Sequence, residues 1–74
     1  MSATLLSNAN SLLALGRPRD ALPYYERYLA ADPNSAEAWH NRGVAFAQTK
    51  RYDEALSCYD RALALFPGSA QTWN

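Results

Sequence analysis

Apolar residues recur at helical spacing in four separate stretches of the chain. In the first stretch, Leu5, Ala9 and Leu12 fall on one face of a helix with about 3.6 residues per turn. The same spacing returns further along, and glycines and prolines stand between the stretches, where they end one helix or open the next. The pattern therefore predicts an all-α protein. The expected helices cover residues 4–15, 18–31, 35–49 and 52–65, and a fifth begins within 69–74.

The last three complete helices carry stripes of aromatic and aliphatic residues that we expect to face a core. In the third helix the stripe holds Trp39, Gly43 and Phe46. Pro23 lies beyond the first turn of the second helix, so we expect a slight bend there with the ring toward solvent. Cys58 is expected to point outward or to be half-buried. The remaining core positions are Ala21, Leu22, Tyr25, Tyr28 and Leu29 in the second helix, and Ala55, Leu56, Tyr59, Ala62 and Leu63 in the fourth.

The third helix has two candidate starting residues, Asn34 and Ser35. Asn34 and Glu37 have the spacing of a capping box, in which the two side chains satisfy backbone N–H groups at the helix start. The sequence leaves open which of the two residues begins the helix.

The two halves of the chain repeat each other at an offset of 34 residues. The offset gives 11 identities among the 40 positions that can be compared, including Tyr25 with Tyr59 and Trp39 with Trp73. A period of this length is typical of stacked helical units rather than of one irregular globule. We expect residues 1–74 to form a single module, with one repeat at about 2–35, a second at about 36–69 and the start of a third at 70–74.

The repeat resembles the tetratricopeptide repeat (TPR) family. The residues that carry this resemblance have the order and spacing of the family pattern; they are Trp39, Gly43, Phe46, Ala55, Tyr59 and Pro67. The first repeat keeps mainly Ala21, Tyr25 and Pro33, and Arg42 stands where the family usually has leucine. The resemblance implies an α-solenoid of two antiparallel helix hairpins, whose first helices line a concave, protein-binding groove.

Composition and charge exclude several other classes. Seven basic residues oppose seven acidic ones, so no excess of positive charge is available to neutralise the phosphates of a nucleic acid. Residues 1–16 have no lysine or arginine and mix polar residues among their leucines, which is typical of neither a signal peptide nor a membrane span. Cys58 is the single cysteine, so no internal disulfide is needed. We expect a cytoplasmic protein that binds neither nucleic acid nor membrane.

No residue pattern predicts catalysis, a metal or a cofactor. His40 is the only histidine, and we interpret it as an exposed polar residue. Asp53 and Glu54 begin a helix, where negative charge interacts favourably with the helix dipole. The sequence therefore predicts a protein that is not an enzyme.

The expected site is a peptide-binding groove along the first helix of each repeat. Asn10 and Asn41 match two asparagines of the carboxylate clamp of TPR co-chaperones, but Leu6 and Gln71 stand where that clamp has lysines. We reject the clamp because no cation remains to neutralise a carboxylate. The predicted groove residues are Asn10, Glu37, His40, Asn41, Val44 and Gln48.

A second resemblance concerns the run of residues 36–43. It is similar to the repeats of O-linked N-acetylglucosamine transferases and their bacterial relatives, in which one asparagine per repeat forms a ladder along the groove. Asn41 holds that place, and its carboxamide offers both a donor and an acceptor to a peptide backbone. The alternative interpretation is that Asn41 is a solvated helix residue.

These observations favour a protein-interaction module of a longer protein, binding an extended peptide or a partner helix. The alternative is a self-assembly module that forms a homodimer through its C-terminal repeat end, where Trp73 and parts of Leu56, Leu63 and Leu65 are expected to lack partners within the chain. A third interpretation, targeting for an attached enzyme such as a glycosyltransferase, has no support within these residues.

Overall fold

The computed structural model describes residues 2–65, with side chains from Thr4 onward, and these residues form four α-helices. The helices are α1 (Ser2–Ala14), α2 (Pro18–Ala31), α3 (Ala36–Gln48) and α4 (Tyr52–Leu65). The predicted all-α class is confirmed. Predicted and observed ends agree to within two residues, the largest difference being the earlier start of α1. The predicted fifth helix, with Trp73, lies outside the described residues.

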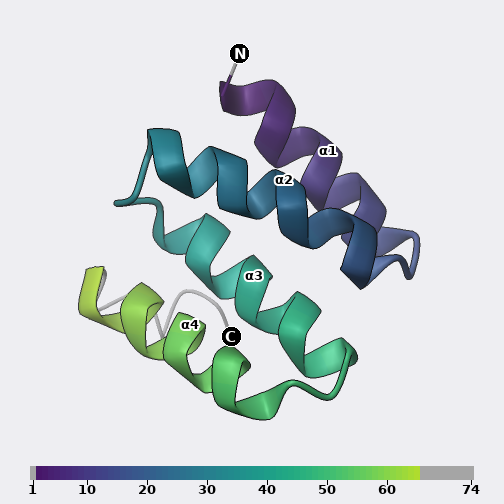
Figure 1. Ribbon diagram of the computed structural model, residues 1–74. Helices are drawn as coiled ribbons and strands as arrows, with labels where there is room; N and C mark the ends of the chain where they lie inside the picture. The colour runs from purple at the N-terminus through teal and green to yellow at the C-terminus, as the bar shows by residue number, and fades with distance from the viewer. Residues whose placement is uncertain (1, 66–74) are drawn as a thin grey trace.

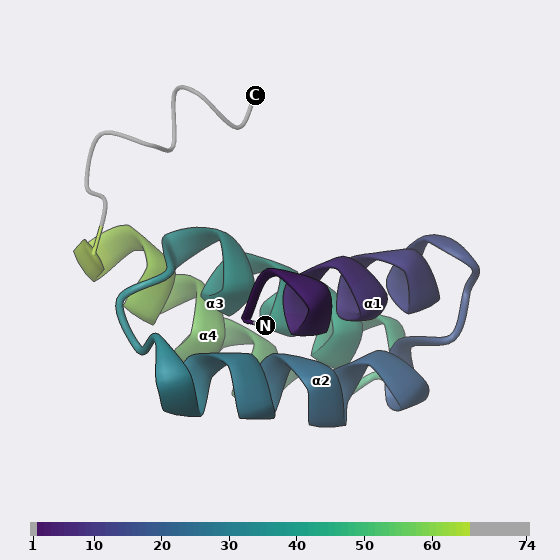
Figure 2. The ribbon, with the colours of Figure 1, turned by 90° about the horizontal axis from the view of Figure 1, so that it is seen from above.

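Neighbouring helices run in opposite directions and follow one another in chain order, from α1 at one edge to α4 at the other (Figure 1). Each helix packs on the next, and α1 also touches α3. Seen from above, α1 and α3 lie next to each other on the same side of α2 (Figure 2). This arrangement places the first helices of the two hairpins side by side.

The two hairpin turns use the same local structure at equivalent repeat positions. Gly16 and Lys50 both adopt a positive φ, of 78° and 65°. Beyond Gly16, the N–H of Arg17 donates to the carbonyl of Leu12 at 2.9 Å, and beyond Lys50 the N–H of Arg51 donates to Phe46 at 2.8 Å. These bonds satisfy carbonyls that the helix end leaves free. The repeat is therefore preserved in the turns although glycine is replaced by lysine.

Ser35, rather than Asn34, caps α3. Its side chain accepts a hydrogen bond from the backbone N–H of Ala38 at 3.2 Å, and its backbone is extended immediately before the helix. Of the two candidate starting residues, Ser35 is therefore the cap, and the capping-box spacing of Asn34 and Glu37 is not used. Because Ser35 is the last non-helical residue, its partner at the third helical position is Ala38.

The core consists of two adjoining clusters. One contains Ala9, Tyr25, Leu29 and Ala38, and it joins the first hairpin to α3. The second is formed mainly between α3 and α4, and Leu22 of α2 joins it; its buried members are Leu22, Ala45, Phe46, Ala55 and Cys58. Trp39 packs against both clusters. The helix α3 therefore holds the fold together, because it contributes to both.

Gly43 permits the closest approach within the second hairpin. A Cβ at this position would lie 2.7 Å from Cε1 of Tyr59 and 3.2 Å from the carbonyl oxygen of Ala55. The first hairpin has Ala9 and Tyr25 at the equivalent positions, and both are fully buried. Ala21 and Ala55, two of the predicted core residues, are buried as well.

The buried face of α4 differs from the predicted stripe. Ala55, Cys58 and Ala62 are buried, whereas Leu56 and Leu63 are 60% and 45% exposed. The expectation of an outward or half-buried Cys58 is wrong. Placing the two leucines on the buried stripe is wrong as well, whereas the expectation that parts of them lack partners within the chain agrees with their exposure. Residues three and four apart share a helix face, so burying positions 55, 58 and 62 turns positions 56 and 63 away from α3. In α2, the ring of Pro23 is exposed, as expected.

Candidate functional site

A pair of asparagine side chains joins α1 to α3. The amide nitrogen Nδ2 of Asn41 donates to Oδ1 of Asn10 at 3.0 Å, and the hydroxyl of Tyr25 donates to the same oxygen at 2.5 Å. Both asparagines are half-buried, whereas Tyr25 is fully buried. Asn10 therefore uses one carbonyl oxygen to fix two neighbours, each from a different helix.

The environment of Tyr25 keeps its phenol neutral. Burial raises the pKa of Tyr25 to about 12, and the negative charge of Glu37 adds to the rise. A hydrogen bond with Asn41 opposes the shift without cancelling it. A neutral hydroxyl retains its proton, so the donation to Asn10 persists at physiological pH.

The amide of Asn41 keeps hydrogen-bonding capacity beyond its contacts with Asn10 and Tyr25. Nothing among residues 2–65 donates to its Oδ1. A carboxamide oxygen accepts up to two hydrogen bonds. Asn41 is therefore held in place from one side while its acceptor is available from the other.

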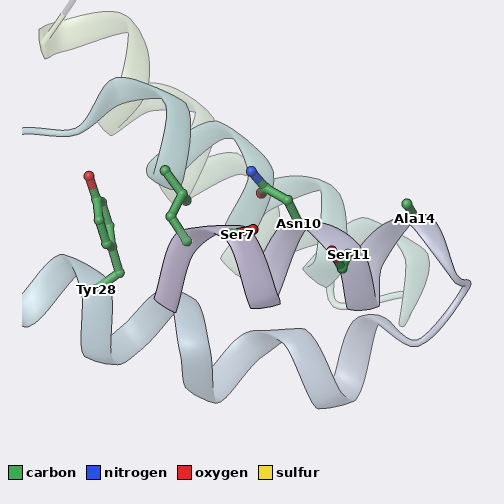
Figure 3. A pocket seen from close by; sticks show the side chains of 6 residues that line it. Ser7, Asn10, Ser11, Ala14 and Tyr28 are labelled. Carbon is green, nitrogen blue, oxygen red and sulfur yellow. The ribbon is translucent and has the colours of Figure 1, made fainter. Parts of the chain in front are cut away.

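An open pocket of about 520 Å³ runs along α1 beside Asn10 (Figure 3). Ser7, Asn10, Ser11 and Ala14 line it from α1, and Tyr28 stands at its other end on α2. Of these residues, sequence reasoning singled out Asn10 for the site. It missed Ser11 and Tyr28, because Tyr28 was assigned to the core and no pattern marked Ser11.

The other predicted groove residues lie along the exposed side of α3. Glu37 and Gln48 are exposed and Val44 is half-buried. Gln48 lines a different depression, beside Gly16 at the turn of the first hairpin. The structure thus brings Asn10 and Asn41 together, with Glu37 close to their partner Tyr25, and places Gln48 apart from them.

His40 is half-buried rather than exposed, which corrects the expectation. Its ring lies 5.4 Å from that of Tyr59, at an angle of 45°. Burial lowers the pKa of His40, because desolvation disfavours the charged imidazolium. His40 therefore lies at the boundary with α4.

A second cluster, built around Arg42, was missed as a unit by sequence reasoning. The guanidinium carbon of Arg42 lies 5.6 Å from the ring centre of Trp39 and 5.1 Å from that of Phe46. Its Nη2 atom is 3.7 Å from Oε2 of Glu26 on α2. Burial raises the pKa of the Cys58 thiol nearby, and the charge of Arg42 opposes this rise. Arg42 replaces leucine here by stacking on aromatic rings.

Comparison with protein families assigns the chain to a known class of repeat. A tetratricopeptide repeat family model matches residues 6–70, nearly the whole chain. The chain belongs to the tetratricopeptide repeat family, whose members are typically non-catalytic modules that mediate protein–protein interaction. A search of curated proteins returned no match.

Two further properties bear on the kind of site. Within the four described helices, no group of three or more His, Cys, Asp or Glu side chains is arranged to hold a metal ion. No helix of residues 2–65 has the length and apolar character needed to cross a bilayer.

Proposed function

We propose that this chain is a cytoplasmic protein-interaction module that binds an extended peptide or a partner helix along the face formed by α1 and α3. The predicted contact residues are Asn10, Glu37, His40, Asn41, Val44 and Gln48. Membership of the tetratricopeptide repeat family supports protein binding in general. The resemblance of residues 36–43 to O-linked N-acetylglucosamine transferase repeats supports a role for Asn41 in holding peptide backbone.

The observation that carries this proposal is the fixed amide of Asn41. Asn10 accepts a hydrogen bond from it at 3.0 Å, and Tyr25 holds Asn10 in turn. A ligand that donates to Oδ1 of Asn41 therefore meets an amide whose orientation is already set. Such preorganisation reduces the conformational entropy lost on binding.

The test uses peptides selected on the immobilised protein from a randomised peptide library. For peptides whose binding perturbs the NMR signals of Asn10 and Val44, Asn41→Ala should weaken affinity by about 1–3 kcal/mol, since a paired polar group loses its partner. Circular dichroism should show the same helix content in variant and parent. Asn8→Ala is the matched control, because Asn8 is exposed on α1 outside the proposed contacts. Equal affinity in Asn41→Ala and parent would remove Asn41 from the site.

The second candidate function is self-assembly into a homodimer through the C-terminal repeat end. The exposure of Leu56 and Leu63 on α4 favours it, because apolar side chains gain about 1.5–3 kcal/mol each on full burial. Sedimentation of the purified chain at micromolar concentrations tests this function. A mass that stays at 8.2 kDa as the concentration rises would exclude it.

A further inference from the structure

A second open pocket, of about 400 Å³, lies between α3 and α4 and is here named the arginine pocket. None of the predicted groove residues lines it. We propose that the arginine pocket binds a carboxylate carried on a small apolar group. One face of each helix contributes to its wall, with Trp39, Arg42 and Phe46 from α3 and Glu54, Cys58 and Arg61 from α4.

The first hairpin lacks this combination of residues. At an offset of 34 residues, the equivalents of the three α3 residues are Leu5, Asn8 and Leu12, which offer neither an aromatic ring nor a cation. Arg27 is the equivalent of Arg61, but the first hairpin has a leucine where the second has a tryptophan. The chemistry of the arginine pocket is therefore particular to the second hairpin and does not follow from the shared repeat pattern.

Three arginines lie over the aromatic rings of the pocket. The Cζ atoms of Arg42 and Arg61 are 5.6 Å and 5.7 Å from the ring centre of Trp39. The Cζ atom of Arg51 is 5.3 Å from the ring centre of Phe46. A guanidinium that lies over a ring keeps N–H groups at its edge, where they match the two oxygens of a carboxylate.

Arg42 makes fewer hydrogen bonds than its burial requires. Its side chain is 23% exposed, and its Nε is buried without a hydrogen-bond partner in the described part of the chain. The ion pair with Glu26 spans 3.7 Å, which is longer than an N–H···O hydrogen bond. Burial of a charged group with incomplete pairing costs free energy. A negative charge in the pocket would offset part of that cost by attracting the guanidinium.

The balance of charges in the pocket favours a monoanion. Glu54 accepts a hydrogen bond from Arg51 at 2.8 Å, and Glu26 pairs with Arg42. No carboxylate among residues 2–65 forms an ion pair with Arg61. One positive charge is therefore uncompensated, while Glu54 in the wall opposes a second negative charge on the ligand. A carboxylate fits this balance better than a phosphate dianion does.

The remaining wall determines what carries the carboxylate. Trp39 is half-buried, so part of its indole is accessible beside the two arginines. The pocket volume of about 400 Å³ lies within the range of about 300–1,000 Å³ that is typical of small-ligand sites. An aromatic ring or a branched aliphatic group next to the carboxylate would pack on the indole. The acidic side chain of a bound protein and a free carboxylic acid share this chemistry.

The experiment titrates the isotope-labelled full chain with phenylacetate and follows it by NMR. The indole N–H signal of Trp39 and the backbone signal of Arg61 should shift, whereas those of Asn10 and Val44 in the predicted groove should not. Phenylacetamide has the same shape without the charge, and it should bind at least tenfold more weakly, because charge-assisted hydrogen bonds are lost. Phenyl phosphate, a dianion above neutral pH, should also bind more weakly because of Glu54.

Three variants separate the charges of the pocket. Arg61→Gln should weaken phenylacetate binding about tenfold and keep the helix content, because this side chain is exposed. Arg27→Gln is the matched control, since it makes the same change of charge at the equivalent position of the first hairpin and should leave the affinity unchanged. Glu54→Gln removes the opposing charge and releases Arg51, so it should strengthen binding about threefold.

A capped pentapeptide with one central glutamate between apolar residues distinguishes the two sources of the carboxylate. Tighter binding than phenylacetate, with the same shifted signals, would assign the pocket to the acidic side chain of a protein, and weaker binding would assign it to a free carboxylic acid. Equal affinity for phenylacetate and phenylacetamide would overturn the inference. So would an unshifted Trp39 signal, tighter binding of phenyl phosphate, or an affinity that Arg61→Gln leaves unchanged.

Discussion

In the first hairpin, the helices cross at Ala9 and Tyr25, and in the second the same repeat positions hold Gly43 and Tyr59. Both members of the first pair are fully buried. Because Ala9 itself carries a methyl group, the first crossing has room for one. At Gly43, a methyl would lie 2.7 Å from Tyr59. The repeat therefore determines which residues meet at the crossing, whereas the side chain at one position determines how closely the helices approach.

The two tyrosines extend this comparison. Tyr25 is fully buried and donates to Asn10, while Tyr59 is half-buried and packs beside His40. Burial raises the pKa of both phenols, and that of Tyr25 reaches about 12. The difference follows from the neighbours: α3 covers Tyr25, but no described helix covers the outer side of Tyr59. Position in a repeat array thus changes the role of an identical residue.

The largest difference between the hairpins is expected for their equivalent leucines. Leu22→Ala should destabilise the fold by about 2–5 kcal/mol, because it leaves a cavity in the core between α2 and α3. Leu56→Ala should change stability by less than about 0.5 kcal/mol, since its side chain is already mostly in water. Urea denaturation of dilute protein, followed by circular dichroism, measures both values. Similar losses for the two substitutions would contradict the burial difference.

A smaller effect is expected from Gly43→Ala. The added methyl must displace the ring of Tyr59 and press on the carbonyl of Ala55, which costs about 1–3 kcal/mol, while alanine's better helix propensity returns about 1 kcal/mol. The net result should be destabilisation. In a Tyr59→Ala background, Gly43→Ala should lose most of its destabilising effect. Thermal melts of the parent, the two single variants and the double variant measure this coupling between the two positions. An additive result would show that the ring does not set the helix separation.

The smallest effect is expected at the hairpin turns. Lys50 adopts the left-handed conformation that costs a non-glycine residue about 1 kcal/mol, so Lys50→Gly should stabilise the protein by about 0.5–1 kcal/mol. Gly16→Ala should destabilise it by a similar amount, because a Cβ there meets nothing within 4 Å and only the backbone strain remains. Urea denaturation measures both changes. Effects of the same sign would contradict the equivalence of the turns.

Much of the fold could be predicted from local signals. Helical periodicity, together with Gly16 and Pro18, indicated the hairpins, and the repeat offset indicated how they stack. The buried face of α4 could not be predicted in the same way. Leu56 and Leu63 look like core residues, because their equivalents in α2 are core residues. Their exposure follows from the place of α4 at the end of the described helices, where it packs on α3 alone. The repeat, rather than the local pattern, gave the expectation that parts of these leucines lack partners.

The candidate site was less predictable than the fold. The spacing of Asn10 and Asn41 placed them on the first helices of adjacent repeats, and the structure brings them within hydrogen-bonding distance. The contact with Tyr25 was not predicted, because it depends on which side of Asn10 the second helix passes. The stacking of Arg42 on Trp39 and Phe46 likewise depends on packing among three helices. Peptide contact by the remaining groove residues stays a prediction.

The burial of Cys58 makes the opening of the second hairpin measurable as a reaction rate. This thiol is the only one in the chain and is 3% exposed, and burial raises its pKa. An alkylating reagent therefore reaches it chiefly when α4 separates from α3. In a repeat array, an outer unit can open without the rest of the molecule. The ratio of the rate of Cys58 alkylation to the rate of global unfolding thus reports how often the second hairpin opens while the first stays folded.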